Sequence, residues 1–201
     1  TNGGTINPFS NKVIFIDEAH NFISRIVNKL NRKTSLSMKL YNYLMDAENC
    51  KIILLSGTPI INYPNEIAIL FNILRGTIRS YNCKLILDKK TMSKEKLEEI
   101  FSNAGILSYV DSIEYNSVSY EVTITQNPFG YVKSQSNKNK MVYTSDVLSS
   151  ENFIKKIKSA LEAQSLKIAG NKININGYKA LPDKFDDFKA LFINPNNTIN
   201  N

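Results

Sequence analysis

The sequence predicts an α/β fold, in which part of a parallel β-sheet is followed by a small α+β module. Two short apolar runs, Val13–Ile16 and Lys51–Leu55, are typical of buried parallel strands. Segments with helical periodicity lie between them, as a crossover between parallel strands requires. Beyond about residue 81 the pattern changes to alternating strands and separate helices. We therefore expect two domains, residues 1–80 and residues 81–201.

Composition narrows the class of protein. The 201 residues are 42% hydrophobic and carry a formal net charge of +7, which suits a globular protein with an anionic partner. Cys50 and Cys83 have no metal-binding spacing, which favours reduced thiols and an intracellular location. No apolar run approaches the roughly 20 residues of a membrane span, so we expect no membrane partner.

The first predicted strand leads directly into Asp17, Glu18, Ala19 and His20. In open α/β sheets, ligands bind beyond the carboxyl ends of the strands. An aspartate there can hold Mg²⁺ on a nucleotide, and a neighbouring carboxylate can accept a proton from an attacking water. The simpler alternative is a strand that ends in solvated acids at a helix N-terminus. For His20 the corresponding alternative is a buried neutral ring bonded to backbone.

Two helices are predicted between the strands. The first covers residues 21–30 and turns one face inward: Phe22, Ile26, Val27 and Leu30. After a polar break, the second starts at Ser35 or Ser37, either of which can cap it, and ends near Ala47. Its expected apolar stripe is Leu40, Tyr43 and Leu44.

The second predicted strand ends in Ser56, Gly57, Thr58 and Pro59. Two hydroxyl groups therefore follow a strand that neighbours the first one, although Gly and Pro are also ordinary turn residues. Pro64 suits the first position of a further helix that stops at Gly76. The stripe expected to face the core is Ile67, Leu70, Phe71 and Leu74.

The two strand ends resemble motifs II and III of superfamily 2 helicases and translocases, as IDEAH at residues 16–20 and LLSGTPI at residues 54–60. The following residues resemble the Snf2-type pattern GTPLQNNLxELWSLLNFL. Five residues fall in register: Asn62, Glu66, Leu70, Asn72 and Leu74. Ile61 and Ala68 stand where the family has Gln and Trp. The match covers roughly residues 11–76 and is similar to helicase-like ATPases of large DNA viruses, including the poxvirus early transcription factor, the poxvirus nucleoside triphosphate phosphohydrolase and giant-virus helicases.

This resemblance implies a RecA-like P-loop NTPase domain within an ATP-dependent DNA helicase or translocase of viral transcription or DNA processing. ATP and Mg²⁺ would be the cofactors, with Asp17 as metal ligand and Asp17 and Glu18 as cofactor-binding residues. Glu18, Asp17 and His20 would be catalytic, and His20 would meet the coupling motif of Ser56, Gly57, Thr58 and Pro59. The expected partners are duplex DNA rather than RNA, and viral transcription machinery. The expected location is a cytoplasmic viral factory, the virion or the host nucleus.

One required motif is missing from the sequence. A phosphate-binding loop needs G-x-x-x-x-G-K-[ST], and Gly3-Gly4-Thr5 does not provide it. Motifs IV to VI of a second RecA-like domain are also missing. We therefore expect residues 1–80 to be the C-terminal half of the first RecA-like domain of a longer ATP hydrolase, with residues 81–201 as an insertion, and the isolated chain to be inactive. The alternative is a non-catalytic remnant that binds nucleic acid or a protein partner.

The second half is predicted from local patterns. The expected elements are a strand at 84–87, a helix at 93–103, an alternating strand at 117–126, a hairpin of 131–132 with 141–143, a helix at 150–164, a type II′ hairpin at Gly170-Asn171 and a last helix from Asp183. The last helix is expected to turn Phe185, Phe188, Leu191 and Phe192 inward, before a polar tail at 194–201.

Two places in the second half could contact nucleic acid. The basic run of Lys89, Lys90, Lys94 and Lys96 is more simply a solvated face. Phe129 and Tyr131 could stack on bases beside three lysines, Lys133, Lys138 and Lys140. The simpler alternative for that second place is a hairpin whose aromatic residues belong to the core.

Overall fold

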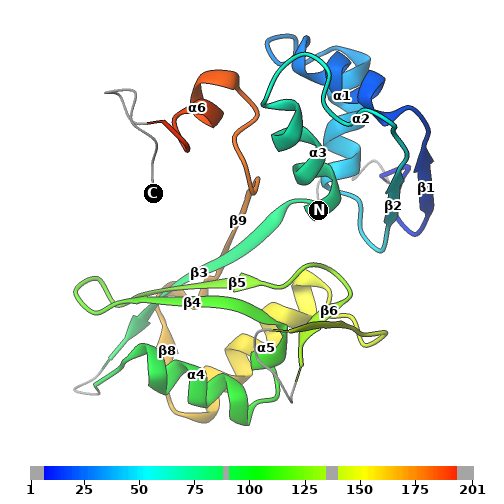
Figure 1. The fold of residues 1–201 in the computed structure, drawn as a ribbon. Helices are drawn as coiled ribbons and strands as arrows, with labels where there is room; N and C mark the ends of the chain where they lie inside the picture. The colour runs from blue at the N-terminus through cyan, green and yellow to red at the C-terminus, as the bar shows by residue number, and fades with distance from the viewer. Residues whose placement is uncertain (1–6, 88–90, 135–139, 194–201) are drawn as a thin grey trace. The chain divides into compact units, whose positions relative to one another are not determined.

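The computed structural model describes residues 7–87, 91–134 and 140–193 (Figure 1). Residues up to Thr77, together with those from Lys179 on, form one compact unit, and Ile78–Tyr178 form another. Helices and strands are mixed in both, which confirms the α/β class in its broad form. The predicted polar tail, the Gly3-Gly4 stretch and three of the predicted surface lysines (Lys89, Lys90 and Lys138) lie outside the described residues.

The first unit contains the predicted parallel pair of strands. β1 (Val13–Ile16) lies beside β2 (Lys51–Leu54), in a register that runs from Val13↔Lys51 to Ile16↔Leu54. The inward face packs Ile14, Ile16, Ile52 and Leu54 against the helices. The other face is apolar and exposed at Val13, Phe15 and Ile53. Parallel sheets are usually covered on both faces. This two-stranded sheet differs, because one of its faces is apolar and exposed.

Three helices, α1 (Ala19–Val27), α2 (Leu36–Met45) and α3 (Glu66–Arg75), build the core of this unit (Figure 1). Their fully buried apolar residues include Ile23, Ile26, Tyr41, Ile69 and Ile73. Ser35 caps α2, because its hydroxyl accepts a hydrogen bond from the Met38 N–H at 3.3 Å. One of the two predicted capping serines is thereby confirmed.

The predicted inward faces of two helices are only partly confirmed: Leu44 of α2 is buried and Leu70 of α3 packs against the core, but other members of both stripes are exposed. In α3 the buried side chains include Ala68, Ile69 and Ile73, whereas Phe71 and Leu74 are 54% and 51% exposed. Apolar side chains occupy most of the circumference of α3, so the periodicity of the sequence alone could not identify the buried face. Packing selects the face that carries Glu66 and Asn72, whose hydrogen bonds are made inside the unit. In α2, Tyr41 is buried and Tyr43 is exposed, for a similar reason.

A buried polar cluster joins α2 and α3 to the segment that begins at Lys179. We call it the Tyr41–Asp183 cluster, after two of its five members, Tyr41, Asn72, Lys179, Leu181 and Asp183. The Tyr41 hydroxyl donates to Asp183 Oδ1 at 2.8 Å, and Asn72 Nδ2 donates to the same oxygen at 3.0 Å. Asn72 also exchanges two hydrogen bonds with the Leu181 backbone, and Lys179 pairs with Asp183. Burial, together with the charge of Asp183, raises the pKa of Tyr41, so its hydroxyl stays a donor.

The segment ends in a short helix, α6 (Phe185–Lys189). Phe188 is buried, as predicted, but three of the four aromatic and aliphatic residues expected inside are exposed: Phe185, Leu191 and Phe192. A five-residue helix has too few turns to bury a complete stripe. Two features therefore hold this segment in the first unit: the hydrogen bonds of the Tyr41–Asp183 cluster and the burial of one phenylalanine, Phe188.

The second unit is an antiparallel sheet around one long strand. β3 (Ile78–Ile86) pairs on one edge with β5 (Glu121–Gln126), which in turn pairs with β4 (Val110–Asn116). Its other edge pairs with β9 (Asn174–Tyr178) and β8 (Lys167–Ile168). The helices α4 (Lys94–Asn103) and α5 (Ser150–Ala163) cover one face of this sheet (Figure 1). Short 3₁₀ turns occupy Leu107–Tyr109 and Ala169–Asn171.

Several local expectations for this unit need correction. β3 begins six residues before the predicted strand, and β4 was not predicted. Residues 117–120 form a turn instead of a strand, with Val118 89% exposed and Tyr120 at φ 59°. The Gly170-Asn171 hairpin is wrong, because β8 and β9 pair with successive parts of β3 and not with each other. The predicted helices are confirmed as α4 and α5, with Ser93 and Ser149 as their caps.

A separate hairpin of β6 (Tyr131–Lys133) and β7 (Met141–Tyr143) confirms the predicted pairing of these segments. In the part of the chain that the structure describes, no helix combines the length and apolar character needed to cross a membrane.

Candidate active site

The carboxyl ends of β1 and β2 are joined beyond the last strand residues. Leu55 N–H donates to the Ile16 carbonyl at 2.9 Å, and Ala19 N–H donates to the Leu55 carbonyl at 2.9 Å. These two bonds continue the parallel pairing past both strands. They bring the residues after β1 next to the residues after β2, which is the juxtaposition that the strand order predicts.

Glu18 lies at the junction of β1 and α1 in a left-handed conformation, with φ 46° and ψ 48°. For a residue with a side chain this conformation costs about 1–2 kcal/mol. Its carboxylate makes no capping hydrogen bond to α1 and is 63% exposed. Instead, the Glu18 N–H donates to Asp17 Oδ1 at 2.9 Å. Glu18 is thus a solvent-exposed acid at the N-terminus of α1, as the simpler alternative describes, and its carboxylate is accessible to a ligand.

His20 connects the two strand ends. Its Nδ1 lies 2.9 Å from Ser56 Oγ and 3.2 Å from Glu18 Oε2, and its side chain is 15% exposed. The predicted contact between His20 and the coupling motif, Ser56 to Pro59, is thus present. Ser56 and Glu18 both contact the His20 ring through their side chains and not through backbone atoms. Ser56 Oγ also accepts a hydrogen bond from the Thr58 N–H at 3.2 Å, which fixes the turn of the second motif. Gly57 and Pro59 complete this turn and are exposed.

The contact of a serine, a histidine and a carboxylate does not form a hydrolase triad. In such a triad the serine and the acid contact opposite nitrogens of the ring, so that a proton can cross the imidazole. Here Ser56 and Glu18 both approach Nδ1 of His20. Two oxygen atoms therefore share one nitrogen. The arrangement suits a positioning contact between the motifs and offers Ser56 no route to act as a nucleophile.

The donor atoms at this edge suit a magnesium ion that also binds phosphate. Mg²⁺ is commonly held by one or two carboxylates together with substrate phosphates and water. Asp17 and Glu18 supply two exposed carboxylates of this kind. Among the described residues, no group of three or more His, Cys, Asp or Glu could hold a metal by itself. The chemistry of the site therefore fits a metal that arrives with a nucleotide, and does not fit a closed protein cage.

Glu66 is a functional candidate that sequence reasoning left without a role. It is 1% exposed, and its Oε2 accepts hydrogen bonds from the N–H groups of Ile61 and Asn62 at 2.7 and 3.2 Å. Asn62 Nδ2 donates to Ser24 Oγ on α1 at 2.7 Å. Together these bonds hold the loop that follows Thr58. The register of Asn62 and Glu66 with the Snf2-type pattern was the signal that could have identified them.

Replacing Glu66 by Gln is expected to destabilise this loop. The amide keeps one oxygen for the two backbone N–H groups but loses the negative charge, and hydrogen bonds to a charged acceptor are roughly twice as strong as neutral ones. Its amino group also faces another donor, Asn62 Nδ2, which lies 3.4 Å from Glu66 Oε1. Limited proteolysis between residues 57 and 64 would measure the effect, and cleavage should be faster in Glu66→Gln. Asp187→Asn is the matched control, because it removes one carboxylate charge from an exposed position. Equal cleavage rates in the two variants would contradict a bracing role for Glu66.

The two cysteines are free thiols and contribute no reactive group to the site. Burial raises the pKa of Cys83 to about 11, so its nucleophilic thiolate form is scarce at neutral pH. Burial also raises the pKa of Cys50.

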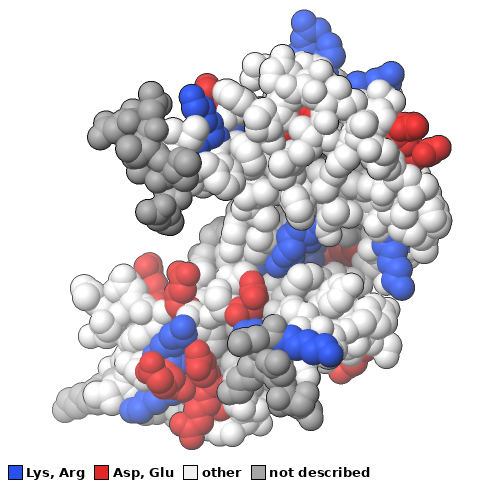
Figure 2. Space-filling view, viewed as in Figure 1, with Lys and Arg blue, Asp and Glu red and all other residues white. Residues whose placement is uncertain are grey.

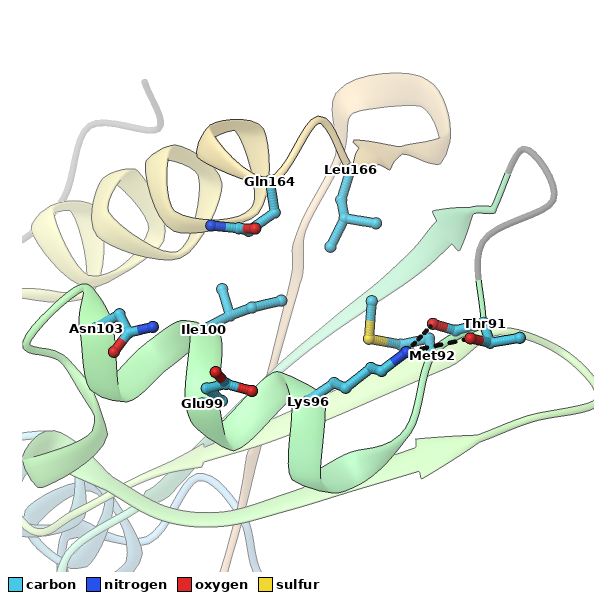
Figure 3. Close-up of a pocket in the computed structure, with 8 residues that line it drawn as sticks. All are labelled: Thr91, Met92, Lys96, Glu99, Ile100, Asn103, Gln164 and Leu166. Atoms are coloured by element: carbon cyan, nitrogen blue, oxygen red, sulfur yellow. Dashed lines mark hydrogen bonds between the residues drawn. The ribbon is translucent and has the colours of Figure 1, made fainter.

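A second concave region lies in the second unit, between α4 and the residues that follow α5 (Figure 3). It is an open hollow of about 570 Å³ whose floor is formed by Met92, Ile100 and Leu166. The ammonium group of Lys96 is bound by the carbonyl and hydroxyl oxygens of Thr91, both at 3.1 Å. The charged residues of its lining are Lys96, whose ammonium group is already bound to Thr91, and Glu99.

Comparison with known proteins finds similarity to viral termination factors. It is 41% identical over 115 residues to proteins named termination factor NPH-I homolog from African swine fever virus, in isolates from a tick in South Africa, a warthog in Namibia and a pig in Kenya. The chain is a partial homologue of these factors. The match covers 53% of this chain and 15% of each relative. No family model matches the sequence, and no solved structure matches it.

Proposed function

We propose that this chain supplies part of the Mg²⁺–ATP site of a DNA helicase or translocase that acts in viral transcription. The observation that carries the proposal is the link from Glu18 through His20 to Ser56, which joins the ends of two parallel strands. The similarity to viral termination factors supports the choice of process. On this proposal, the first unit belongs to a RecA-like domain of Snf2 type and the second unit, Ile78–Tyr178, is an insertion. The expected division into residues 1–80 and 81–201 changes because the segment from Lys179 packs with the first unit.

Each residue at the strand ends has a distinct role in this mechanism. Asp17 binds the metal, whose charge offsets that of the phosphate oxygens. Glu18 orients the attacking water and accepts its proton, a contribution typically worth about 10²- to 10⁴-fold in rate. The exposure of Glu18 supports this role, because its carboxylate is accessible to a nucleotide and its attacking water.

The second motif couples the nucleotide to nucleic acid in this proposal. His20 contacts Ser56, and the turn from Ser56 to Pro59 continues into the loop held by Glu66. A displacement of the Glu18 carboxylate can therefore be transmitted to this loop through His20 Nδ1 and Ser56 Oγ. Duplex DNA is the proposed partner, and a viral factory, the virion or the host nucleus is the proposed location.

A non-catalytic role is the second candidate. It is favoured by the exposed aromatic and basic side chains of the second unit, which include Tyr131, Tyr143 and Lys140. In that case the chain would bind nucleic acid or a protein partner without turning over ATP. Measuring nucleotide binding with and without Mg²⁺ separates the two candidates.

Asp17→Asn in the native full-length protein is expected to weaken Mg²⁺-dependent ATP binding by about 10- to 100-fold. The amide removes the charge that attracts the metal but keeps an oxygen to accept from the Glu18 N–H, so the turn should survive. Titration with fluorescent ATP, in Mg²⁺ and in EDTA, would measure the change. Asp186→Asn is the exposed control. If Asp17→Asn binds Mg²⁺–ATP as tightly as the control, the metal site is refuted and the non-catalytic role is favoured.

A further inference from the structure

The hairpin of β6 and β7 carries exposed aromatic side chains beside lysines. Tyr131 pairs with Tyr143, and Lys133 pairs with Met141, so these four side chains share one face of the hairpin. Tyr131 and Tyr143 are 45% and 63% exposed. Phe129, in the turn before β6, is also exposed. The alternative that these aromatics belong to the core is therefore wrong.

The two tyrosine rings are held in a fixed arrangement. They contact edge to face, with ring centroids 6.1 Å apart and planes at 84°. Gly130 has φ 79°, and a Cβ atom there would lie 3.3 Å from the Tyr143 ring. Glycine thus permits both the turn and the close approach of the ring. The Thr144 N–H donates to the Gly130 carbonyl at 2.9 Å and closes the hairpin. A preformed aromatic surface loses little side-chain entropy when a ligand binds.

Positive charge lies on and beside this surface. The Lys133 ammonium donates to the Asp111 carbonyl at 2.7 Å, which leaves two of its three N–H groups for other acceptors. Lys140, directly before β7, is exposed. The nearby carboxylate of Asp146 accepts a hydrogen bond from the Tyr109 hydroxyl at 2.8 Å. Elsewhere, Figure 2 shows basic and acidic side chains interspersed on the face in view, without one extended basic patch.

We propose that this hairpin binds single-stranded nucleic acid through the face that carries Tyr131, Lys133, Met141 and Tyr143, together with Phe129 in the preceding turn and the exposed Lys140 directly before β7. Bases stack on the two tyrosine rings, and the lysine ammonium groups contact phosphates. Single-strand binding surfaces combine these two features, because every base has an aromatic face. A protein partner would also use Tyr and Met, but it would have to supply acidic groups for both lysines. The inference rests on the proposed function for its choice of a nucleic acid as partner, and adds a single-strand site to the duplex DNA proposed above.

The test compares binding of a short fluorescent oligothymidine by the native full-length protein and by two variants. Tyr131→Leu and Tyr143→Leu keep apolar bulk but remove the flat ring. Each is expected to lower affinity by about 5- to 150-fold. Tyr178→Leu is the control, because Tyr178 is similarly exposed on β9 of the same unit. Lys140→Gln should lower the slope of log affinity against log salt by about 0.7, the value for one phosphate contact on a single strand.

A second measurement keeps the test valid if a variant misfolds. An oligonucleotide that contains 5-iodouridine forms photo-crosslinks with aromatic rings on which it stacks, and peptide mapping of the unaltered protein should place them at Tyr131 or Tyr143. Crosslinks confined to other residues, or equal oligonucleotide binding by folded Tyr143→Leu and its control, would overturn the proposal. Such equality would also favour a protein partner for this face. Mg²⁺–ATP binding measured on the same variants should be unchanged, so this inference and the proposed ATP site can fail separately.

Discussion

Glu18→Gln is expected to lower ATP hydrolysis by the native full-length protein about 10²- to 10⁴-fold, while ATP binding is retained. Glutamine has the same shape as glutamate but cannot accept a proton from water. The backbone of Glu18 already has its left-handed conformation without help from a capping bond, so the substitution removes no structural contact of the carboxylate except that with His20. Steady-state phosphate release, with Mg²⁺–ATP affinity measured in parallel, would report both quantities.

The contact with His20 requires its own control. His20→Asn keeps a polar group near the position of Nδ1, where it can still meet Ser56 Oγ. If Glu18 acts as the base, His20→Asn should retain much more basal turnover than Glu18→Gln and should mainly alter the stimulation by DNA. Undiminished turnover in Glu18→Gln would refute the catalytic role of this carboxylate. Equal losses in both variants would assign Glu18 a positioning role through His20.

The candidate site could be predicted because its parts follow from local sequence. Each apolar run specifies a strand, and parallel neighbours bring their carboxyl ends to the same edge of a sheet. The proximity of His20 and Ser56 also requires β1 and β2 to be neighbours, which the resemblance to helicase motifs II and III implied and the structure shows. The conformation of Glu18 could not be predicted, because a left-handed glutamate is imposed by the hydrogen bonds on both sides of it.

The parts that could not be predicted depend on contacts between residues far apart in the sequence. The inward face of α3 is chosen by Asn72, which bonds to Leu181, 109 residues away. In the second unit, Gly170 does have a positive φ of 62°, as a turn signal suggests. Its flanking strands nevertheless pair with β3, because a long central strand offers both of them more hydrogen bonds than a short hairpin would. Local patterns give element type well but do not give pairing or register.

Asp183→Ala is expected to destabilise the first unit strongly. Tyr41 is fully buried, and its hydroxyl and the Asn72 amide both donate to Asp183 Oδ1. Removing the carboxylate leaves the buried Tyr41 hydroxyl without its acceptor, at a cost of about 1–3 kcal/mol. Asn72 Nδ2 loses one acceptor but still donates to the Leu181 carbonyl at 2.8 Å. Lys179 also loses its partner, but its side chain is 34% exposed, so water compensates that loss in part. Hydrogen exchange of the α2 and α3 amides, with urea unfolding, would measure the change.

Two further variants separate the contributions within the Tyr41–Asp183 cluster. Asp183→Asn keeps an oxygen for the Tyr41 hydroxyl and removes only the charge that faces Lys179, so its loss of stability should lie between those of the native protein and Asp183→Ala. Asp187→Ala removes an exposed carboxylate four residues away and should change little. If Asp183→Ala accelerates exchange only in the segment from Lys179 to Ile193, the cluster docks that segment onto an independently stable unit. If exchange in α2 and α3 accelerates equally, the segment is an integral part of the core. Protection equal to that of Asp187→Ala throughout would contradict any stabilising role for Asp183.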